Sequence, residues 1–298
     1  MTPRCNDANE EATIAAALRR ATHALGDSGC AEPRLDAELL LAHILRSDRR
    51  HLYAHSDARL APAQQAAFDA LVQRRAAREP LAYITGQREF YGRDYYVDRR
   101  VLIPRPETEQ LVELALAHLR SLSTDPCYVA DVGTGSGIIA ITIALEWPRA
   151  IVYGLDLSAD ALAVAAINSA RLGVAERVVL RCGDLLAPLE RRVHCIVANL
   201  PYVAANEWSE LSPEIRHYEP EMALAGGPDG LDLIRRLLSQ AGDYLLPGGA
   251  ILLEIGAQQG LAALALAAHA FPDARMRLHC DFSGLDRVLA VHLAPTHA

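Results

Sequence analysis

The stretch Asp131-Val132-Gly133-Thr134-Gly135-Ser136-Gly137 decides which fold the chain can adopt. It ends the apolar run 127–132, which predicts a buried strand, and it precedes a helix predicted over 138–145. Glycines at such a turn let a ligand approach the backbone, and the helix amino terminus favours an anionic group. A dinucleotide fingerprint needs its third glycine where Ile138 stands, which weakens an NAD-binding interpretation without excluding it. The stretch therefore predicts the ligand-binding edge of an α/β sheet.

Strands and helices alternate from Cys127 onward, which predicts a doubly wound, mostly parallel sheet of seven strands. The expected strands are 127–132, 150–155, 177–182, 193–198, 250–255, 274–280 and 287–293. The loop from Asp281 to Asp286 is too short for a helical crossover. The last two strands should therefore form a hairpin, which makes one of them antiparallel in the sheet.

The tips of four successive strands of this sheet carry polar side chains, namely Asp131, Asp156, Asp184 and Asn199. In open α/β sheets ligands bind at the carboxyl ends of the strands. Asp156 can accept both hydroxyls of a ribose, and Asp184 can meet an adenine amine beside the apolar Leu185. Each Asp alone is as well explained by a helix cap. Four polar residues at consecutive strand tips favour S-adenosylmethionine, which has an ammonium and a sulfonium but no pyrophosphate. They therefore predict a class I methyltransferase.

The tetrapeptide Asn199-Leu200-Pro201-Tyr202 stands at the end of the fourth strand. The Asn199 side-chain oxygen and a backbone carbonyl can accept both N–H bonds of an NH₂ group, while the Tyr202 ring covers its flat face. Such a clamp suits a planar amide or amine, and makes Asn199, Pro201 and Tyr202 the candidate catalytic residues. The alternative is a strand that simply ends in a proline turn.

The first part of the chain has a different pattern. Helices are expected over 13–25, over 33–45 and after Pro62, and they predict a small helical domain at 1–79. A β-hairpin is expected over 90–97, within a linker at 80–109 that precedes a methyltransferase domain at 110–298. The prolines at 104 and 106 fix an extended segment, which is either plain linker or a cleft wall with Arg105 and Glu107 as its polar groups.

Composition excludes several classes of protein. The formal net charge is −8, and all 29 basic residues are Arg, so no Schiff-base, Walker or kinase lysine exists. This charge argues against a protein whose main task is to grip nucleic-acid backbone. No apolar run approaches the length of a membrane span. The sequence leaves the oligomeric state open, with a monomer favoured.

The cysteines and histidines predict neither disulfides nor a metal site. The six Cys form no CxxC pair and are expected to be reduced thiols of a cytosolic protein. His51 and His55 are an i, i+4 pair without a third ligand nearby, so a solvated helix end is expected there. Met1 to Glu11 has no apolar core, so we expect neither signal nor transit peptide, and a cytoplasmic protein.

Several motifs resemble those of the HemK/PrmC family, the peptide chain release factor glutamine methyltransferases. They are Tyr83-Ile84-Thr85-Gly86, Phe90-Tyr91-Gly92, Leu102-Ile103-Pro104-Arg105-Pro106-Glu107-Thr108-Glu109, Asp131 to Gly137, Asn199 to Tyr202, Glu219-Pro220, Gly226-Gly227-Pro228-Asp229-Gly230-Leu231, Leu253-Glu254-Ile255-Gly256 and Gly284-Leu285-Asp286-Arg287-Val288. The resemblance implies methyl transfer from S-adenosylmethionine to the side-chain nitrogen of the glutamine in the Gly-Gly-Gln loop of release factors. It also implies that the helical domain serves release-factor recognition.

The resemblance places the cofactor and the substrate on neighbouring loops. The expected cofactor residues are Asp131, Gly133, Thr134, Gly135, Ser136, Gly137, Asp156, Asp184, Leu185 and Asn199, while Asn199 to Tyr202 would hold the glutamine amide. Leu200 stands where the family usually has proline. The accepting groups, the Asn199 side chain and the residue 200 carbonyl, survive this change, but the choice of substrate is less firmly implied.

Three other functions remain open at this stage. An adenine-amine or rRNA N-methyltransferase shares the tetrapeptide but needs a basic docking surface, which the charge does not favour. A non-catalytic adaptor that binds S-adenosylmethionine has no need of an amide clamp. An NAD-dependent dehydrogenase is the third alternative, and the spacing of the glycines departs from its dinucleotide fingerprint.

Overall fold

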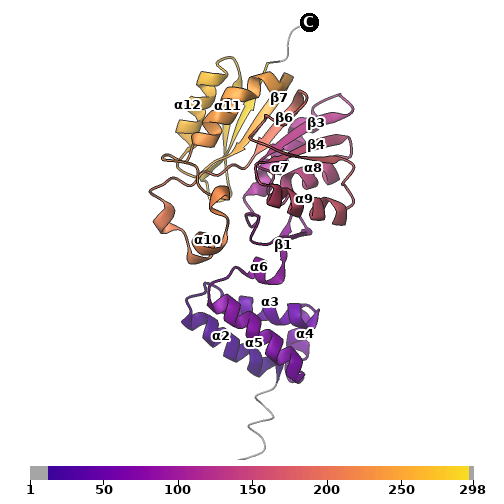
Figure 1. Ribbon diagram of the computed structural model, residues 1–298, viewed down its shortest axis with the longest axis vertical. Helices are drawn as coiled ribbons and strands as arrows, with labels where there is room; N and C mark the ends of the chain where they lie inside the picture. The colour runs from indigo at the N-terminus through magenta and orange to yellow at the C-terminus, as the bar shows by residue number, and fades with distance from the viewer. Residues whose placement is uncertain (1–12, 295–298) are drawn as a thin grey trace, which may run out of the picture. The chain divides into compact units, whose positions relative to one another are not determined.

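The computed structural model describes residues 13–294, and these divide into two compact units. The first unit holds residues 13–86 together with the short helix α10 (Pro213–Tyr218), and the second holds 87–212 and 219–294. Figure 1 labels most of the helices and several strands. Met1 to Glu11, for which no leader peptide is expected, lies outside the described residues. None of the described helices is both long and apolar enough to cross a membrane.

The first unit is a bundle of short helices around one apolar core. Its helices are α2 (Ile14–Asp27), α3 (Pro33–Leu45), α4 (Arg49–Ala54), α5 (Pro62–Ala76) and α6 (Leu81–Thr85). Prolines begin α3 and α5, where the missing N–H leaves no helical bond unmade. Leu25, Leu40 and Phe68 are fully buried in the core. The three helices expected from the sequence are confirmed, whereas α4 and α6 are too short to show a helical period.

Helix α10 belongs to this first unit although it lies far along the chain. Glu214 accepts hydrogen bonds from Arg78 at 2.7 Å and from Arg75 at 3.0 Å, and Arg75 also binds Asp36 at 2.7 Å. The hydroxyl of Tyr218 donates to the carbonyl of Ala77 at 2.6 Å. Burial alone would raise the pKa of Glu214, but hydrogen bonds from the two arginines hold it down at about 2. The bundle therefore retains α10 through ion pairs with Arg75 and Arg78 and through the Tyr218 hydrogen bond.

The second unit is built on a sheet with the strand order β5-β4-β3-β6-β7-β9-β8. Its strands are β3 (Cys127–Val132), β4 (Ala150–Asp156), β5 (Val178–Cys182), β6 (Val193–Ala198), β7 (Leu245–Glu254), β8 (Arg275–Cys280) and β9 (Asp286–His292). Strands β3 to β7 pair in parallel, and β9 is antiparallel to both of its neighbours. The predicted hairpin and the doubly wound class are confirmed. Strand β7 begins at Leu245, five residues before its expected start.

Helices cover both faces of this sheet (Figure 1). One face carries α7 (Thr108–Arg120), α8 (Ile138–Glu146) and α9 (Ala159–Arg171), and the other carries α11 (Asp232–Tyr244) and α12 (Gly260–Ala270). Short 3₁₀ turns lie at Trp208–Glu210 and Glu221–Ala223. Apolar side chains fill a separate core on each side. The strand ends are thereby left as the open edge of the unit.

The expected hairpin forms from β1 (Gln87–Phe90) and β2 (Arg93–Tyr96) and packs onto the α8 side of the sheet. Phe90 and Tyr95 are buried in that core, and the Tyr95 hydroxyl lies 2.8 Å from the hydroxyl of Thr142 in α8. The hairpin is thus part of the second unit rather than a free linker.

Replacing Glu214 with Gln is expected to lower the free energy of unfolding by about 1–3 kcal/mol at pH 7, because Arg75 and Arg78 lose an ionised partner. The folded pKa of about 2 lies below the ordinary value of 4.5, so this contribution is complete above pH 4.5 and is lost as pH falls toward 2. Urea unfolding at several pH values measures it. The exposed Glu210→Gln is the matched control, and equal stability of the two variants would contradict the assignment.

Candidate active site

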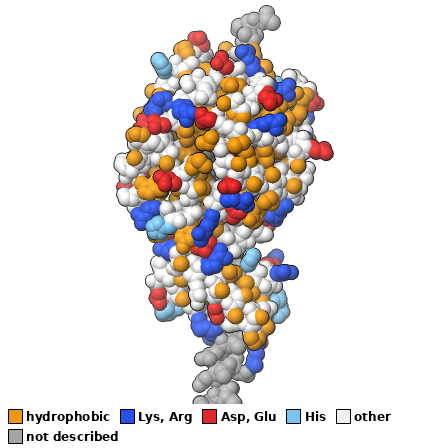
Figure 2. All heavy atoms as spheres, viewed as in Figure 1, with side chains coloured by type: hydrophobic (Ala, Val, Ile, Leu, Met, Phe, Trp, Pro, Cys, Tyr) orange, Lys and Arg blue, Asp and Glu red, His pale blue; other side chains and the backbone are white. Residues whose placement is uncertain are grey.

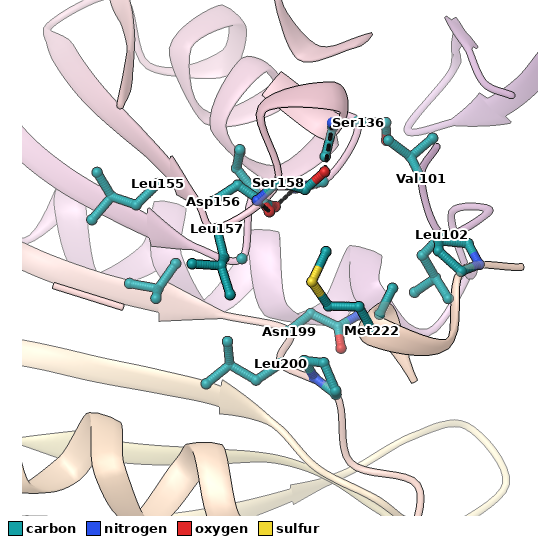
Figure 3. Close-up of a pocket in the computed structure, with 18 of the residues that line it drawn as sticks. Val101, Leu102, Ser136, Leu155, Asp156, Leu157, Ser158, Asn199, Leu200 and Met222 are labelled. Atoms are coloured by element: carbon teal, nitrogen blue, oxygen red, sulfur yellow. Dashed lines mark hydrogen bonds between the residues drawn. The ribbon is translucent and has the colours of Figure 1, made fainter. Parts of the chain in front are cut away.

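A mainly apolar cavity opens at the carboxyl ends of β3, β4, β5 and β6, where the sequence places its polar strand-tip residues. All of its lining residues belong to the second unit. Figure 3 shows Asp156 and Ser158 on one side of this cavity, with Asn199 and Leu200 on the other. The predicted residues that line it are Arg105, Gly133, Thr134, Gly135, Ser136, Asp156, Asp184, Leu185, Asn199, Leu200 and Pro201. Asp131, Gly137, Tyr202 and Glu107 lie outside the lining.

The loop from Gly133 to Gly137, here called the glycine loop, is hydrogen-bonded to Asp156 at the end of the neighbouring strand β4. One carboxylate oxygen of Asp156 accepts the backbone N–H of Gly135 at 2.8 Å, and the other accepts the N–H of Ser158 at 2.8 Å. Burial raises the pKa of this carboxyl, while these backbone N–H groups pull it back down. The side chain of Asp156 therefore has its position set before any ligand binds.

The same loop lies against the tetrapeptide. Gly133 has a φ of +75°, and a Cβ placed there would come within 3.1 Å of the Leu200 side chain and 3.7 Å of the Asn199 carbonyl. Both the backbone conformation and the close approach favour glycine at this position. The loops that follow β3 and β6 thus form one continuous wall of the cavity.

Asp131 and Gly137 lie behind the loop. The Asp131 side chain is fully buried, where it accepts the Thr134 hydroxyl at 2.6 Å and the backbone N–H of Ala140 at 3.0 Å. Burial raises the pKa of its carboxyl to about 7. A Cβ on Gly137 would come within 3.1 Å of the Ala165 side chain. Both residues shape the loop from behind, and in this structure neither faces the cavity.

Asp184 and Leu185 follow β5 on the far side of the cavity. Leu185 is buried, with a positive φ of 48°. The Asp184 carboxylate is about half exposed and pairs with the guanidinium of Arg236 in α11. An adenine amine would therefore share this carboxylate with Arg236.

The end of the tetrapeptide is held by hydrogen bonds from Gln259 and, at the adjacent Val203, by the segment 224–226. Val203 donates its N–H to the Leu224 carbonyl at 2.9 Å, and Gly226 donates to the Val203 carbonyl at 2.9 Å. The side chain of Gln259 donates to the Tyr202 carbonyl at 2.8 Å. Burial raises the pKa of the Tyr202 phenol to about 12, so the ring stays neutral.

Arg105 forms part of the cavity wall, as one of the two sequence interpretations expected. Its guanidinium donates to Glu219 at 2.6 Å and to the Ile103 carbonyl at 3.0 Å. The Glu219 side chain is almost fully buried and also accepts the N–H of Ile103 at 3.2 Å. Arg105 is thereby fixed in place, whereas Glu107 does not line the cavity.

Family models match two parts of the chain: the PrmC N-terminal domain over residues 16–86, and the ribosomal protein L11 methyltransferase (PrmA) over 108–221. The release factor glutamine methyltransferase of Cereibacter sphaeroides is 45% identical over 277 residues, which cover 93% of this chain and 97% of that protein. The same-named protein of Moorella thermoacetica is 43% identical, covering 92% of this chain and 96% of that one. The chain belongs to the release factor glutamine methyltransferase family. The resemblance stated from the motifs is confirmed.

The fold agrees with a solved methyltransferase from Pyrococcus furiosus, with a TM-score of 0.50 at 16% identity over 76% of this chain and 98% of that one. Identity this low supports the fold alone. Family and fold together imply S-adenosylmethionine as the methyl donor. Among residues 13–294, no group of three or more His, Cys, Asp or Glu side chains is arranged to hold a metal ion.

Several residues that line the cavity were missed from the sequence. They are mostly apolar and include Val101, Leu102, Leu157, Met222 and Ala223. Leu157 and Met222 are more than half exposed although both line the cavity. Figure 3 shows Met222 at the cavity beside Asn199. The position of Leu157 directly after Asp156 was an available signal, whereas nothing in the sequence placed Met222.

Replacing Gly133 with Ala is expected to weaken S-adenosylmethionine binding about tenfold, because the new methyl group presses on Leu200 at the cavity wall. Titration calorimetry measures the affinity. Gly92→Ala is the matched control, since Gly92 has a φ of +72° but no atom within 4 Å of an added Cβ. The control shares the backbone strain and should keep its affinity. An unchanged affinity in the Gly133 variant would contradict the close approach as a binding determinant.

Proposed function

We propose that this protein transfers a methyl group from S-adenosylmethionine to the side-chain amide nitrogen of the glutamine in the Gly-Gly-Gln motif of peptide chain release factors. The observation that carries the proposal is the position of Asn199, whose side chain lines the cavity at the β6 tip beside the glycine loop. The relatives named release factor glutamine methyltransferase, which align over more than nine-tenths of the chain, support the substrate.

The described residues fit the methyl donor. The apolar lining suits its adenine and methionine carbon atoms, while Asp156 provides a carboxylate for the ribose hydroxyls. A Cβ at Gly133 would intrude on the wall that the donor must lie against. Leu185 provides an apolar surface and Asp184 a carboxylate at the adenine end. When bound, the donor supplies an electrophilic methyl group on a sulfonium.

The tetrapeptide would orient the glutamine amide. An amide nitrogen is a poor nucleophile, because its lone pair is delocalised into the carbonyl. In our proposal the Asn199 side-chain oxygen and the Leu200 carbonyl accept its two N–H bonds, which draws electron density toward nitrogen and fixes its direction. Alignment of this kind supplies on the order of several kcal/mol of the barrier. No buried base is required, since the methylated nitrogen is strongly acidic and gives its proton to water as the product leaves the cavity.

The remaining cavity wall would exclude water around the reacting amide. Leu102, Met222 and Ala223 are apolar, and Arg105 is held by Glu219. A mostly apolar surround strengthens the polar contacts made by Asn199, because water no longer competes for them. Tyr202 lies just outside the lining, so in this structure the amide's flat face would meet Pro201 first.

The partner would be the folded release factor, and we place its recognition in the helical unit. The family model of the PrmC N-terminal domain matches residues 16–86, which supports a role shared by the family for that unit. On the face shown in Figure 2, basic and acidic side chains are interspersed, which favours a protein partner over nucleic-acid backbone. The described cysteines are free thiols, as suits a cytoplasmic protein.

Incubating a release factor with this protein and S-adenosylmethionine should add one methyl group, seen by intact-mass analysis as a single 14-dalton increment. A release factor whose Gly-Gly-Gln glutamine is replaced by alanine is the control and should gain none. Methylation of both proteins would place the reaction elsewhere. Methylation of neither, with donor binding confirmed by calorimetry, would overturn the proposed substrate and favour a nucleic-acid amine.

Asn199→Ala is expected to lower kcat by at least about a hundredfold, because the amide loses one of its two acceptors. Donor affinity should stay within a few-fold, since the glycine loop and Asp156 remain. Single-turnover methylation and calorimetry measure the two quantities. Asn206→Ala, at an exposed position of the next loop, is the matched control. Turnover retained by the Asn199 variant would remove the clamp from the mechanism.

A further inference from the structure

Two buried polar residues, Thr108 and Glu254, lie next to Asn199 and belong to elements other than β6. Strands β6 and β7 pair with Ala198 opposite Leu253, so the next residues, Asn199 and Glu254, extend from neighbouring strand ends. Thr108 is the first residue of α7, and this helix packs on the face of the sheet that also carries α8. Thr108 is fully buried and Glu254 is 1% exposed. Sequence reasoning assigned neither residue a role.

One hydrogen bond joins Asn199 to Thr108, and Glu254 is the buried carboxyl at the end of the neighbouring strand. The Asn199 side-chain nitrogen donates to the Thr108 hydroxyl at 3.2 Å. That hydroxyl has a single proton of its own to donate, and Glu254 provides a buried carboxyl oxygen that has no hydrogen-bond partner among the described residues. A carboxylate can only accept, so an ionised Glu254 favours the arrangement in which the hydroxyl proton is directed toward the carboxylate and the hydroxyl lone pairs face Asn199. The order of donors and acceptors is therefore set by the glutamate.

This order matters because the two ends of an asparagine amide are opposite in character. The nitrogen end donates and the oxygen end accepts, and a rotation of 180° about the last side-chain bond exchanges them. Only the oxygen end can accept an N–H of a substrate amide. A rotated Asn199 would present its own donors to the substrate amide nitrogen, which would oppose binding.

We propose that Thr108 and Glu254 are positioning residues for methyl transfer, which lock the Asn199 amide with its nitrogen on Thr108 and its oxygen toward the substrate nitrogen. This inference rests on the proposed role of Asn199 as an amide acceptor. Neither residue needs to touch the reacting atoms. Their effect is to remove the non-productive orientation before the substrate arrives.

The surroundings of Glu254 make the lock sensitive to pH. Burial raises the pKa of Glu254 to about 7, while the Thr108 hydroxyl and the charge of Arg287 oppose the rise. The charge of Glu107 adds to it, and a hydrogen bond with Tyr202 opposes it. Within residues 13–294 one carboxyl oxygen of Glu254 is buried without a hydrogen-bond partner. A neutral Glu254 can donate to Thr108, which frees the threonine proton to donate toward Asn199 and permits the rotated amide.

The test compares threonine variants in the release-factor methylation assay. Thr108→Val keeps the shape but removes the hydroxyl, and it should lower kcat about tenfold to a hundredfold with donor affinity unchanged within twofold. Thr108→Ser keeps the hydroxyl and should recover kcat to within a few-fold of wild type. Thr142→Val is the matched control, because Thr142 is an equally buried threonine whose hydroxyl bonds Tyr95 away from the cavity. It should lose stability but retain kcat.

The pH profile tests the glutamate. Wild-type kcat should rise as pH increases through about 7, where Glu254 becomes ionised. Glu254→Gln cannot ionise and should show a flat profile over the same range, with a kcat below that of the wild type at pH 8. Circular dichroism of each variant confirms that it is folded.

Each outcome bears on a different claim. A wild-type protein that leaves the release factor unmethylated overturns the proposed function and this inference together. An active wild type with an equally active Thr108→Val overturns the inference alone. So does a Thr108→Ser variant as impaired as the valine, because a lost hydroxyl would then not be the cause. An inflection near pH 7 that persists in Glu254→Gln removes the glutamate from the lock.

Discussion

The parallel pairing of β3 with β6 is the constraint on which the site depends. With Val132 opposite Ala198, the two strands end at the same level, and their next residues begin the glycine loop and the tetrapeptide. Gly133 can then approach Leu200 to a distance at which any side chain would intrude. A donor-binding loop and an amide-binding loop therefore share one wall. A shift of one residue in this register would turn the Asn199 side chain to the opposite face of the sheet.

Buried carboxyls mark this edge of the sheet, and stability alone does not explain them. Asp131 and Glu254 both have pKa values raised to about 7 by burial, and each leaves one oxygen without a partner among the described residues. Leaving such an oxygen unpaired costs on the order of 1–3 kcal/mol. Asp131 compensates by holding Thr134 and the start of α8, which shapes the loop. Glu254 has no comparable structural task, which is why a role in orienting Asn199 accounts for it better.

Much of the fold followed from local patterns, and the failures have physical causes. Strands β3, β4, β6 and β7 were predictable because each contains an apolar run of strand length with a polar residue at or next to its end. The hairpin at 281–286 was predictable because its loop is short. The membership of α10 in the helical unit was not, because it depends on Glu214 meeting Arg75 and Arg78 across more than a hundred residues. Asp131 was expected at the cofactor by its place in the motif. A strand's last residues alternate between faces, and the Asp131 side chain bonds the buried start of α8.

Leu200 shows how packing can replace covalent rigidity. A proline at this position would restrict the backbone through its ring, and the family usually has one. Here the Leu200 side chain is 4% exposed and packs in the core on the α11 side, and it also lies close to Gly133. The carbonyls of Tyr202 and Val203 are fixed by hydrogen bonds, because the Gln259 side chain donates to the first and the Gly226 N–H to the second. Burial on one side and hydrogen bonds on the other thus hold the carbonyl of residue 200 in place without a second proline. The departure from the family tetrapeptide changes how the loop is held, while the two acceptors that would grip an amide remain.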